Sequence, residues 1–334
     1  MRAIVVKEYG PIHSHVVEQV SDPSPEPGQV LVDIHAIGLN FPDVLMLEGK
    51  YQNRPSELPF VPGRDASGLV IDVGDGVTGF KPGDKVLVQV FSGAFAEKVA
   101  APQERCCPMP DSMNFVDAAA MITTYRTAYI GVVVRGQIQP GETALVTGAA
   151  GGVGVAAVQL LKAKGANVIA AVSTPEKARF AVDNGADHAI YTNSDDLKAA
   201  FRGQVEKVTG AAQGRGCDLA YDTVGGDVFD ACLRVLKFAG RLVIAGFANG
   251  QIPAAKANYL LYNNLTVMGG PLDINFKMAY PVMQQAMAEI NDLYTQGKLK
   301  PTVMRTYPLE DFKTAFDVIT GRQVLGKVVL TIDR

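Results

Sequence analysis

The chain has 334 residues, of which 48% are hydrophobic, and this length corresponds to about two domains of roughly 150 residues each. Its formal net charge is −3 and it has no basic run, so we expect neither a nucleic-acid partner nor binding to a membrane. The four cysteines form no C-x-x-C pair, so we expect no disulfides. The N-terminus lacks a secretory leader and no apolar run could span a bilayer, so we expect a cytoplasmic protein.

The first part of the chain, up to about residue 120, contains short apolar runs separated by turn residues. The runs at 30–34, 68–73 and 86–90 are divided by sequences rich in glycine, proline and aspartate. This spacing is typical of an all-β region.

The pattern then changes to strands that alternate with helices. We expect a helix over 116–134, then a strand over 143–147, a helix over 152–164, a strand over 167–172, a helix over 175–184, a strand over 188–191, a helix over 194–209, a strand over 218–222, a helix over 227–236 and a strand over 241–245. This alternation predicts an α/β fold with a doubly wound parallel sheet. After residue 265 only a long helix at 278–296 and a last strand at 327–332 stand out, and we expect this short tail to pack on the first region.

A glycine-rich turn follows the strand at 143–147. It reads Ala149-x-Gly151-x-x-Gly154, the dinucleotide fingerprint G-x-G-x-x-G with alanine at its first position. Gly151 would let the backbone approach a pyrophosphate, and Gly154 would let the next helix pack close to the strand. The glycines alone also suit an ordinary tight turn, but the strand before it and the helix after it favour a dinucleotide site.

The end of the strand at 167–172 indicates which dinucleotide is bound. An NAD site places an acidic residue there to bind the ribose 2′-hydroxyl. Here Ser173 and Thr174 offer hydroxyls, Lys177 and Arg179 offer positive charge, and the nearest acid, Glu176, lies inside the following helix. The set suits a 2′-phosphate, so we predict NADPH, selected by Ser173 and Lys177; the alternative is that Lys177 is only a solvated surface residue.

Several further motifs are spread along nearly the whole chain. They are Pro25-x-Pro27-Gly28-Gln29-Val30-Leu31-Val32, Gly38-Leu39-Asn40-Phe41-x-Asp43, Pro59-x-Val61-Pro62-Gly63, Gly83-Asp84-Lys85-Val86, Asp222-Thr223-Val224-Gly225 and Gly326-Lys327-Val328-Val329-Leu330. On these motifs and the turn at 149–154, the chain resembles the zinc-independent NADPH:quinone oxidoreductase branch of the medium-chain dehydrogenase/reductase superfamily.

The resemblance implies a GroES-like β domain, formed by residues 1–120 and 266–334, and a Rossmann NADPH-binding domain at 121–265. It also implies that the nicotinamide lies at the base of a cleft between these domains. The strand before Pro271 resembles a family dimer element, which implies a homodimer, although Pro271 and Asp273 are unusual for an edge pairing.

Zinc-dependent members of the superfamily have a cysteine at the position of Asn40, a histidine at that of Arg64 and a third ligand at that of Thr123. None of these three residues is a plausible zinc ligand, so we expect no metal. Arg64 would then meet either an anionic substrate or Asp65. Without a Lewis acid to activate an alcohol, reduction of an electrophile that accepts hydride directly is the expected chemistry.

The resemblance makes Asn40 and Tyr51 the candidate catalytic residues. The Asn40 amide would hydrogen-bond a quinone or enone oxygen beside the nicotinamide, or else only stabilise a turn. Tyr51 matches a tyrosine that is the proposed proton donor in related enoyl-thioester reductases, or else is a packed loop aromatic. Asp43 is expected to cap the helix that follows Asn40.

The resemblance also implies cofactor contacts beyond the glycine-rich turn. Thr127 would lie near the nicotinamide ribose, Gly246 and Phe247 at the nicotinamide edge, and Arg322 at the phosphates, unless Arg322 is an ordinary surface arginine. The predicted cofactor-binding residues are Thr127, Ala150, Gly151, Gly152, Val153, Gly154, Ser173, Lys177, Gly246, Phe247 and Arg322.

These features together predict an NADPH-dependent reductase that transfers hydride to a small electrophile, either a quinone or an activated alkene. Tyr51 favours an alternative within the same chemistry, an enoyl- or acryloyl-CoA reductase. A second alternative is a non-catalytic NADPH-binding sensor protein. The sequence does not specify the physiological acceptor, because the walls of such a site come from variable loops.

Overall fold

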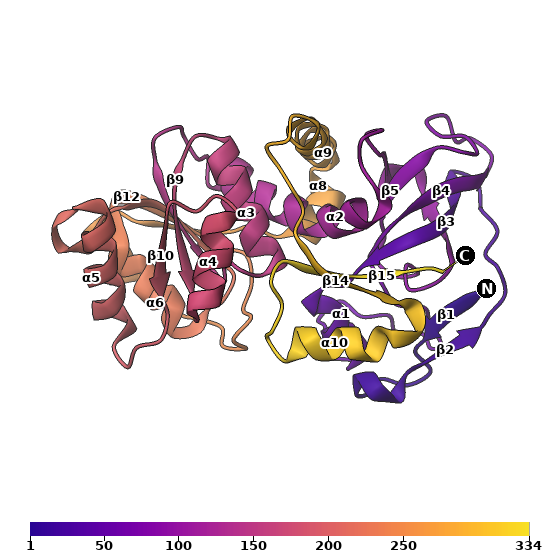
Figure 1. The fold of residues 1–334 in the computed structure, drawn as a ribbon, viewed down its shortest axis with the longest axis horizontal. Coiled ribbons are helices and arrows are strands. Elements are labelled where there is room, and N and C mark those ends of the chain that lie inside the picture. The colour runs from indigo at the N-terminus through magenta and orange to yellow at the C-terminus, as the bar shows by residue number, and fades with distance from the viewer. Residues whose placement is uncertain (334) are drawn as a thin grey trace. The chain divides into compact units, whose positions relative to one another are not determined.

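The computed structural model describes residues 1–333, which form two compact units. The first unit combines Met1–Thr123 with the chain from Pro301 onward, and the second unit is Thr124–Lys300. Both ends of the chain, indigo and yellow in Figure 1, therefore belong to the same unit. The α/β unit is inserted between them in the sequence, as the resemblance implies.

The first unit is built on a seven-stranded sheet. Its strands follow the order β14-β15-β3-β4-β5-β7, with β6 paired to β3, while β1 and β2 form a separate antiparallel pair. The strands are β1 (Arg2–Val5), β2 (Val16–Gln19), β3 (Gln29–Gly38), β4 (Asp65–Val73), β5 (Lys85–Gln89), β6 (Lys98–Pro102), β7 (Cys106–Pro108), β14 (Val303–Pro308) and β15 (Lys327–Thr331). The helices α1 (Phe41–Leu47) and α10 (Phe312–Thr320) complete this unit, and α2 (Phe115–Tyr129) begins in it.

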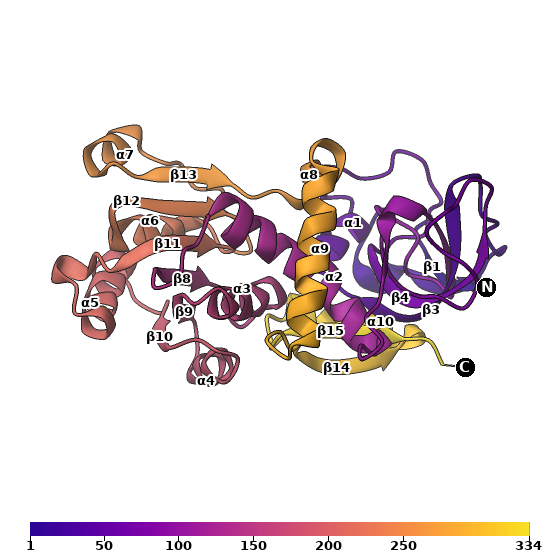
Figure 2. The same ribbon diagram turned by 90° about the horizontal axis from the view of Figure 1, so that it is seen from above.

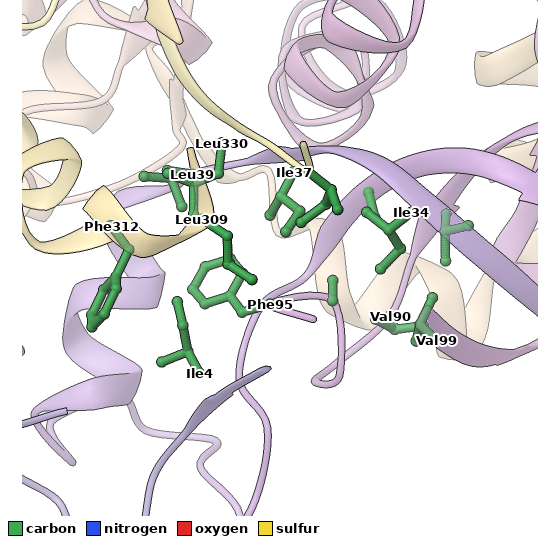
Figure 3. Packing of buried hydrophobic residues seen from close by; sticks show 14 of the residues in the cluster. Ile4, Ile34, Ile37, Leu39, Val90, Phe95, Val99, Leu309, Phe312 and Leu330 are labelled. Atoms are coloured by element: carbon green, nitrogen blue, oxygen red, sulfur yellow. The ribbon is translucent and has the colours of Figure 1, made fainter. Parts of the chain in front are cut away.

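The two chain ends share one hydrophobic core in this unit. The last strand, β15, pairs with β3 antiparallel, so that Leu330 lies opposite Ile37. Figure 3 shows Phe95, Leu330 and Phe312 in the same cluster, and all three are buried. Because each such side chain contributes about 1.5–3 kcal/mol when buried, this core is what holds the C-terminal segment to the first region.

The second unit contains a six-stranded parallel sheet with the order β10-β9-β8-β11-β12-β13. Its strands are β8 (Thr143–Thr147), β9 (Asn167–Val172), β10 (His188–Tyr191), β11 (Cys217–Asp222), β12 (Leu236–Ile244) and β13 (Thr266–Gly269). Its helices after α2 are α3 (Gly152–Ala163), α4 (Pro175–Asp183), α5 (Leu197–Thr209), α6 (Gly226–Val235), α7 (Ala257–Asn263), α8 (Leu272–Met278) and α9 (Tyr280–Thr295). The order reverses between β8 and β11, which is where doubly wound sheets bind their ligands.

The helices cover both faces of this sheet (Figure 2). α5 and α6 pack together on one face, where Phe201 and Phe229 are buried against the strand residues Leu145 and Ala220. The right-handedness of parallel crossovers puts α3 and α4 on the opposite face. No helix within residues 1–333 is both long and apolar enough to cross a membrane.

The predicted strands at 143–147, 167–172 and 188–191 coincide with β8, β9 and β10. The helix predicted over 116–134 is instead α2 followed by a π-helical segment at Ile130–Arg135. The second predicted domain boundary also needs correction, because residues 266–300 belong to the second unit and not to the first. The reason is that β13 extends the parallel sheet by pairing with β12, a contact that local periodicity does not reveal.

Candidate functional site

The glycine-rich turn leads from β8 into α3. Gly148 adopts φ +58°, in the left-handed region where glycine carries no steric penalty. The N–H of Gly151 then donates to the carbonyl of Gly148 at 2.9 Å, and α3 begins at Gly152. The tight bend is therefore made at Gly148, one residue before Ala149, which is why the first fingerprint position tolerates alanine.

Gly151 and Gly154 of this turn are glycines for different physical reasons. A Cβ on Gly154 would lie 2.1 Å from the carbonyl oxygen of Gly148 and 2.8 Å from the Cα of Ala149, so only glycine fits there. A Cβ on Gly151 would meet nothing closer than 3.5 Å. The close approach of helix and strand thus requires Gly154, whereas the space beside Gly151 is open to a ligand phosphate at the start of a helix.

Ser173 and Lys177 come together at the end of β9. Thr174 is the N-cap of α4, and its side chain accepts from the Lys177 N–H at 3.2 Å. The Lys177 Nζ lies 3.5 Å from the Ser173 Oγ, and both side chains are half-buried. Asn193 Nδ2 donates to the Ser173 carbonyl at 2.6 Å and fixes the backbone there. A hydroxyl and an ammonium converging at this position fit the 2′-phosphate of a dinucleotide.

Asp222 links the turn after β8 to the turn after β11. Its carboxylate is fully buried and accepts from the Thr147 Oγ at 2.6 Å and from the Val224 N–H at 3.0 Å. Burial raises the pKa of this carboxyl, and the hydrogen bonds oppose that effect. Asp222 opens the motif Asp222-Thr223-Val224-Gly225, but the motif by itself does not reveal what this residue does. The structure shows that it fixes the two turns relative to each other.

The remaining predicted residues of the second unit lie nearby. Gly246 and Phe247 follow β12, where the Ala245 N–H donates to the Asp222 carbonyl at 2.8 Å. The Thr127 carbonyl accepts from the hydroxyl of Tyr221, in β11, at 3.3 Å. The loops after β8, β9, β11 and β12 all leave the carboxyl ends of neighbouring parallel strands, so the structure gathers the glycine-rich turn, Ser173 and Gly246 with Phe247 at one edge of the sheet, while Thr127 comes from α2.

In the first unit, the Asn40 amide is held by three protein groups. Its Nδ2 donates to the Asp65 Oδ2 at 2.9 Å and to the Gly38 carbonyl at 3.3 Å, and its Oδ1 accepts from the Lys327 Nζ at 2.5 Å. A hydrogen bond from this amide to a substrate would have to replace one of these bonds. The predicted substrate contact of Asn40 remains a prediction.

Lys327 and Asp65 form a buried charge pair beside Asn40. Their Nζ and Oδ2 atoms are 3.8 Å apart, and Asp65 also accepts from the Thr123 hydroxyl at 2.6 Å. Burial lowers the pKa of Lys327, while the charge of Asp65 opposes this. An ammonium that bonds Asn40 is incompatible with a zinc ion bound by the same residue, and Arg64 adds a second cation. The set of Asn40, Arg64 and Thr123 therefore does not fit zinc. The role of Lys327 does not follow from its motif, because its partners come from the other end of the chain.

Asp43 lies at the start of α1, as expected for a capping residue. Its Oδ2 accepts from the Asn40 N–H at 2.7 Å, and its side chain is buried. Burial, with a smaller contribution from the charge of Asp65, raises the pKa of Asp43 to about 7. This carboxyl therefore titrates near neutral pH.

Tyr51 is paired with Arg64. The Arg64 Nη1 donates to the Tyr51 Oη at 3.2 Å, and its guanidinium carbon lies 5.9 Å from the centre of the tyrosine ring. Arg64 is 8% exposed and directly precedes Asp65, which places this pair in the same neighbourhood as Asn40. An anionic oxygen that forms on Tyr51 would be stabilised by the guanidinium.

Arg322 lies in the turn after α10. It is exposed and adopts φ +57°, and its N–H donates to the Ile319 carbonyl at 3.1 Å. Arg322 belongs to the first unit and the glycine-rich turn to the second, so its contact with the cofactor phosphates stays a prediction.

Two protein families match the two units. Residues 26–111 match the family described as "Alcohol dehydrogenase GroES-like domain", and residues 152–286 match "Zinc-binding dehydrogenase". The "Quinone oxidoreductase-like protein 2 homolog" of Nematostella vectensis is 38% identical over 305 residues, which cover 90% of this chain and 81% of that protein.

Solved structures are similar over almost the whole chain. Escherichia coli quinone oxidoreductase complexed with NADPH has a TM-score of 0.89 and 29% identity, and the match covers 99% of this chain and 100% of that one. The mycobacterial protein Rv1454c complexed with NADPH has a TM-score of 0.90 and 32% identity, with the same coverage of 99% and 100%.

Proposed function

The chain belongs to the quinone oxidoreductase branch of the medium-chain dehydrogenase/reductase superfamily, and from this premise we propose that it is a zinc-independent reductase of quinones or activated alkenes. One observation supports this most. The Lys327 ammonium bonds Asn40 and faces Asp65, where zinc-dependent relatives hold their metal. A site that already holds the positively charged Lys327 ammonium is unsuited to zinc-assisted alcohol oxidation. It suits an acceptor that takes hydride directly.

The cofactor is NADPH. Gly151 leaves the backbone open to the pyrophosphate at the start of α3, and Ser173 with Lys177 receives the 2′-phosphate. When bound, NADPH supplies the hydride. The role of the protein is to hold the nicotinamide beside Thr127, Gly246 and Phe247, so that the hydride donor and the substrate are aligned.

Tyr51 is the proton donor for an acceptor that requires one. Hydride addition to the β-carbon of an enone or enoyl thioester leaves an enolate, which needs a proton at its α-carbon. The Tyr51 hydroxyl provides that proton, and Arg64 stabilises the resulting phenolate through its bond at 3.2 Å. A reduced quinone takes its proton from water more easily, so it depends less on Tyr51.

The direct test is oxidation of NADPH with a panel of acceptors. We expect turnover with a simple quinone such as 9,10-phenanthrenequinone and with small enones, and a strong preference for NADPH over NADH. Binding of NADPH without oxidation by any quinone, enone or enoyl-CoA would refute the proposal. That result would instead support the alternative of a non-catalytic NADPH-binding sensor.

The Tyr51–Arg64 pair favours a second candidate, an enoyl- or acryloyl-CoA reductase. The two candidates differ in their dependence on the phenol. Replacing Tyr51 with phenylalanine should leave quinone reduction nearly unchanged and should strongly reduce turnover of crotonyl-CoA. Crotonyl-CoA turnover well above that of every quinone would identify the enoyl reductase.

We also propose that the chain forms a homodimer. β13 is one of the two edge strands of the six-stranded sheet and ends at Gly269, so Pro271 and Asp273 lie beyond it and do not interrupt a pairing. An exposed edge strand offers unpaired backbone groups to a second copy. Light scattering should give twice the mass of one chain, and the substitution Val267→Pro should reduce the measured mass to that of the monomer.

A further inference from the structure

A pocket of about 330 Å³ in the second unit is lined by basic and polar side chains and by no acid. The lining residues are Arg215, Arg234, Lys256, Asn258, Tyr259, Tyr262 and Asn263. Arg215 precedes β11, Arg234 lies in the last turn of α6 before β12, and Lys256 precedes α7. These positions lead into the amino ends of the strands, whereas the glycine-rich turn, Ser173 and Lys177 follow the carboxyl ends of β8 and β9. The pocket is therefore separate from the dinucleotide site.

Two guanidinium groups of this pocket are held in place by one tyrosine. The Arg234 guanidinium lies 3.9 Å above the centre of the Tyr259 ring. The Arg215 Nη1 donates to the Asn263 Oδ1 at 2.7 Å, and its Nη2 is 3.5 Å from the Tyr259 Oη. Asn263 is only 7% exposed and donates to the Tyr259 carbonyl at 2.8 Å. The two cations are thus ordered before any ligand arrives, which reduces the entropy cost of binding.

The positive charge of the pocket is not balanced by the protein. Among residues 1–333, no carboxylate forms an ion pair with Arg215, Arg234 or Lys256, and the acid of α6, Asp230, pairs with Lys198. The dipole at the end of α6 favours one cation, Arg234, but it does not account for three. Three like charges around one pocket repel one another, and an anion bound between them would remove that repulsion.

We propose that this pocket binds a phosphate-bearing anion with at least two negative charges. Arginine forks match phosphate oxygens in pairs, and Lys256 adds a mobile point charge. Tyr262, which is 90% exposed, offers a hydroxyl at the rim.

The test is calorimetric titration of inorganic pyrophosphate into the protein saturated with NADPH, so that the dinucleotide phosphate site is already filled. We expect one pyrophosphate per chain. Lys256→Met and Arg234→Met should each weaken binding about tenfold, because each removes a charge-assisted bond. Lys207→Met is the matched control: Lys207 is an exposed lysine of α5 outside the pocket, and its removal should leave the affinity unchanged.

Three outcomes would overturn the proposal: no pyrophosphate binding to the NADPH-saturated protein, equal binding by Lys256→Met and the unaltered chain, or an equal loss in the Lys207→Met control. Light scattering on the same samples decides whether a second copy fills the pocket instead. If the unaltered chain binds no pyrophosphate and the mass of Lys256→Met differs from that of the unaltered chain, these cations belong to a protein interface. Lys256 is exposed, so its substitution should not disturb folding, and retained NADPH binding confirms this.

Discussion

Lys327 donates a hydrogen bond from Nζ to Oδ1 of Asn40 at 2.5 Å, although the two residues are 287 positions apart in the sequence. This bond fixes which way the Asn40 amide points, because the oxygen faces Lys327 and the nitrogen faces Asp65. The last strand of the chain thereby determines the geometry of a residue that follows β3.

The first prediction concerns this buried pair. Lys327→Met leaves the Asp65 carboxylate buried without its cation, so we expect the free energy of unfolding in urea to fall by about 3–5 kcal/mol. Adding Asp65→Asn should recover part of the loss, since the buried charge is then gone. Lys81→Met, at an exposed lysine of the same unit, is the control and should change little. A loss below about 1 kcal/mol for Lys327→Met would show that the pair is not important for stability.

The second prediction concerns Arg64 and Tyr51. Arg64→Gln should reduce kcat for crotonyl-CoA because the phenolate on Tyr51 loses its cation, and Arg64→Lys should restore part of it. In a Tyr51→Phe background, Arg64→Gln should have no further effect on kcat, since residues that act together are not additive. Additive losses would mean that Arg64 acts independently of Tyr51, for example by binding the substrate. Quinone reduction by the same variants serves as the reference.

The third prediction concerns cofactor selection. Lys177→Ala removes an ammonium that lies 3.5 Å from the Ser173 Oγ, and it should raise the KM for NADPH about tenfold. The KM for NADH should stay the same, because NADH has no 2′-phosphate. Lys207→Ala, at an exposed lysine of the same unit, should alter neither value. Equal effects on NADPH and NADH would show that Lys177 does not recognise the 2′-phosphate.

The fourth prediction concerns two helical glycines. A Cβ on Gly154 would lie 2.1 Å from a backbone oxygen, so Gly154→Ala should destabilise the protein by about 1–3 kcal/mol and weaken NADPH binding. Gly203 in α5 has nothing within 4 Å of its Cβ position, and Gly203→Ala should stabilise by about 0.5–1 kcal/mol. Thermal unfolding measures both, and a neutral Gly154→Ala variant would contradict the tight packing of α3 on β8.

The fifth prediction concerns pH. The pKa of Asp43 is raised from 3.8 to about 7. At a pH between these two values, the folded chain therefore keeps a proton on Asp43 that the unfolded chain has lost. Asp43 therefore lowers the free energy of unfolding as the pH rises from about 4 to about 7, by at most about 4 kcal/mol. Asp43→Asn should remove this dependence and be more stable than the unaltered chain at pH 8. Asp111→Asn, at an exposed aspartate, should leave the pH profile unchanged.

The sequence by itself determined the features that depend on local patterns. Strand periodicity placed β8, β9 and β10 correctly, and the glycine-rich turn predicts a dinucleotide site after β8, because each feature is encoded within a few consecutive residues. The choice of NADPH likewise came from neighbouring positions, Ser173 and Lys177. The resemblance carried by the motifs implies that Asn40, Arg64 and Thr123 stand where zinc-dependent members have ligands, and this stays a prediction.

Only the tertiary structure decided which distant residues meet. It brought Lys327 to Asn40, Arg64 to Tyr51, and the Thr147 hydroxyl to Asp222. It also assigned residues 266–300 to the second unit through the pairing of β13 with β12. Such contacts follow from the burial of long-range surfaces and the pairing of strand edges, which no short stretch of sequence specifies. The buried charge pair of Lys327 and Asp65 beside Asn40 belongs to this second class, since its lysine comes from the other end of the chain.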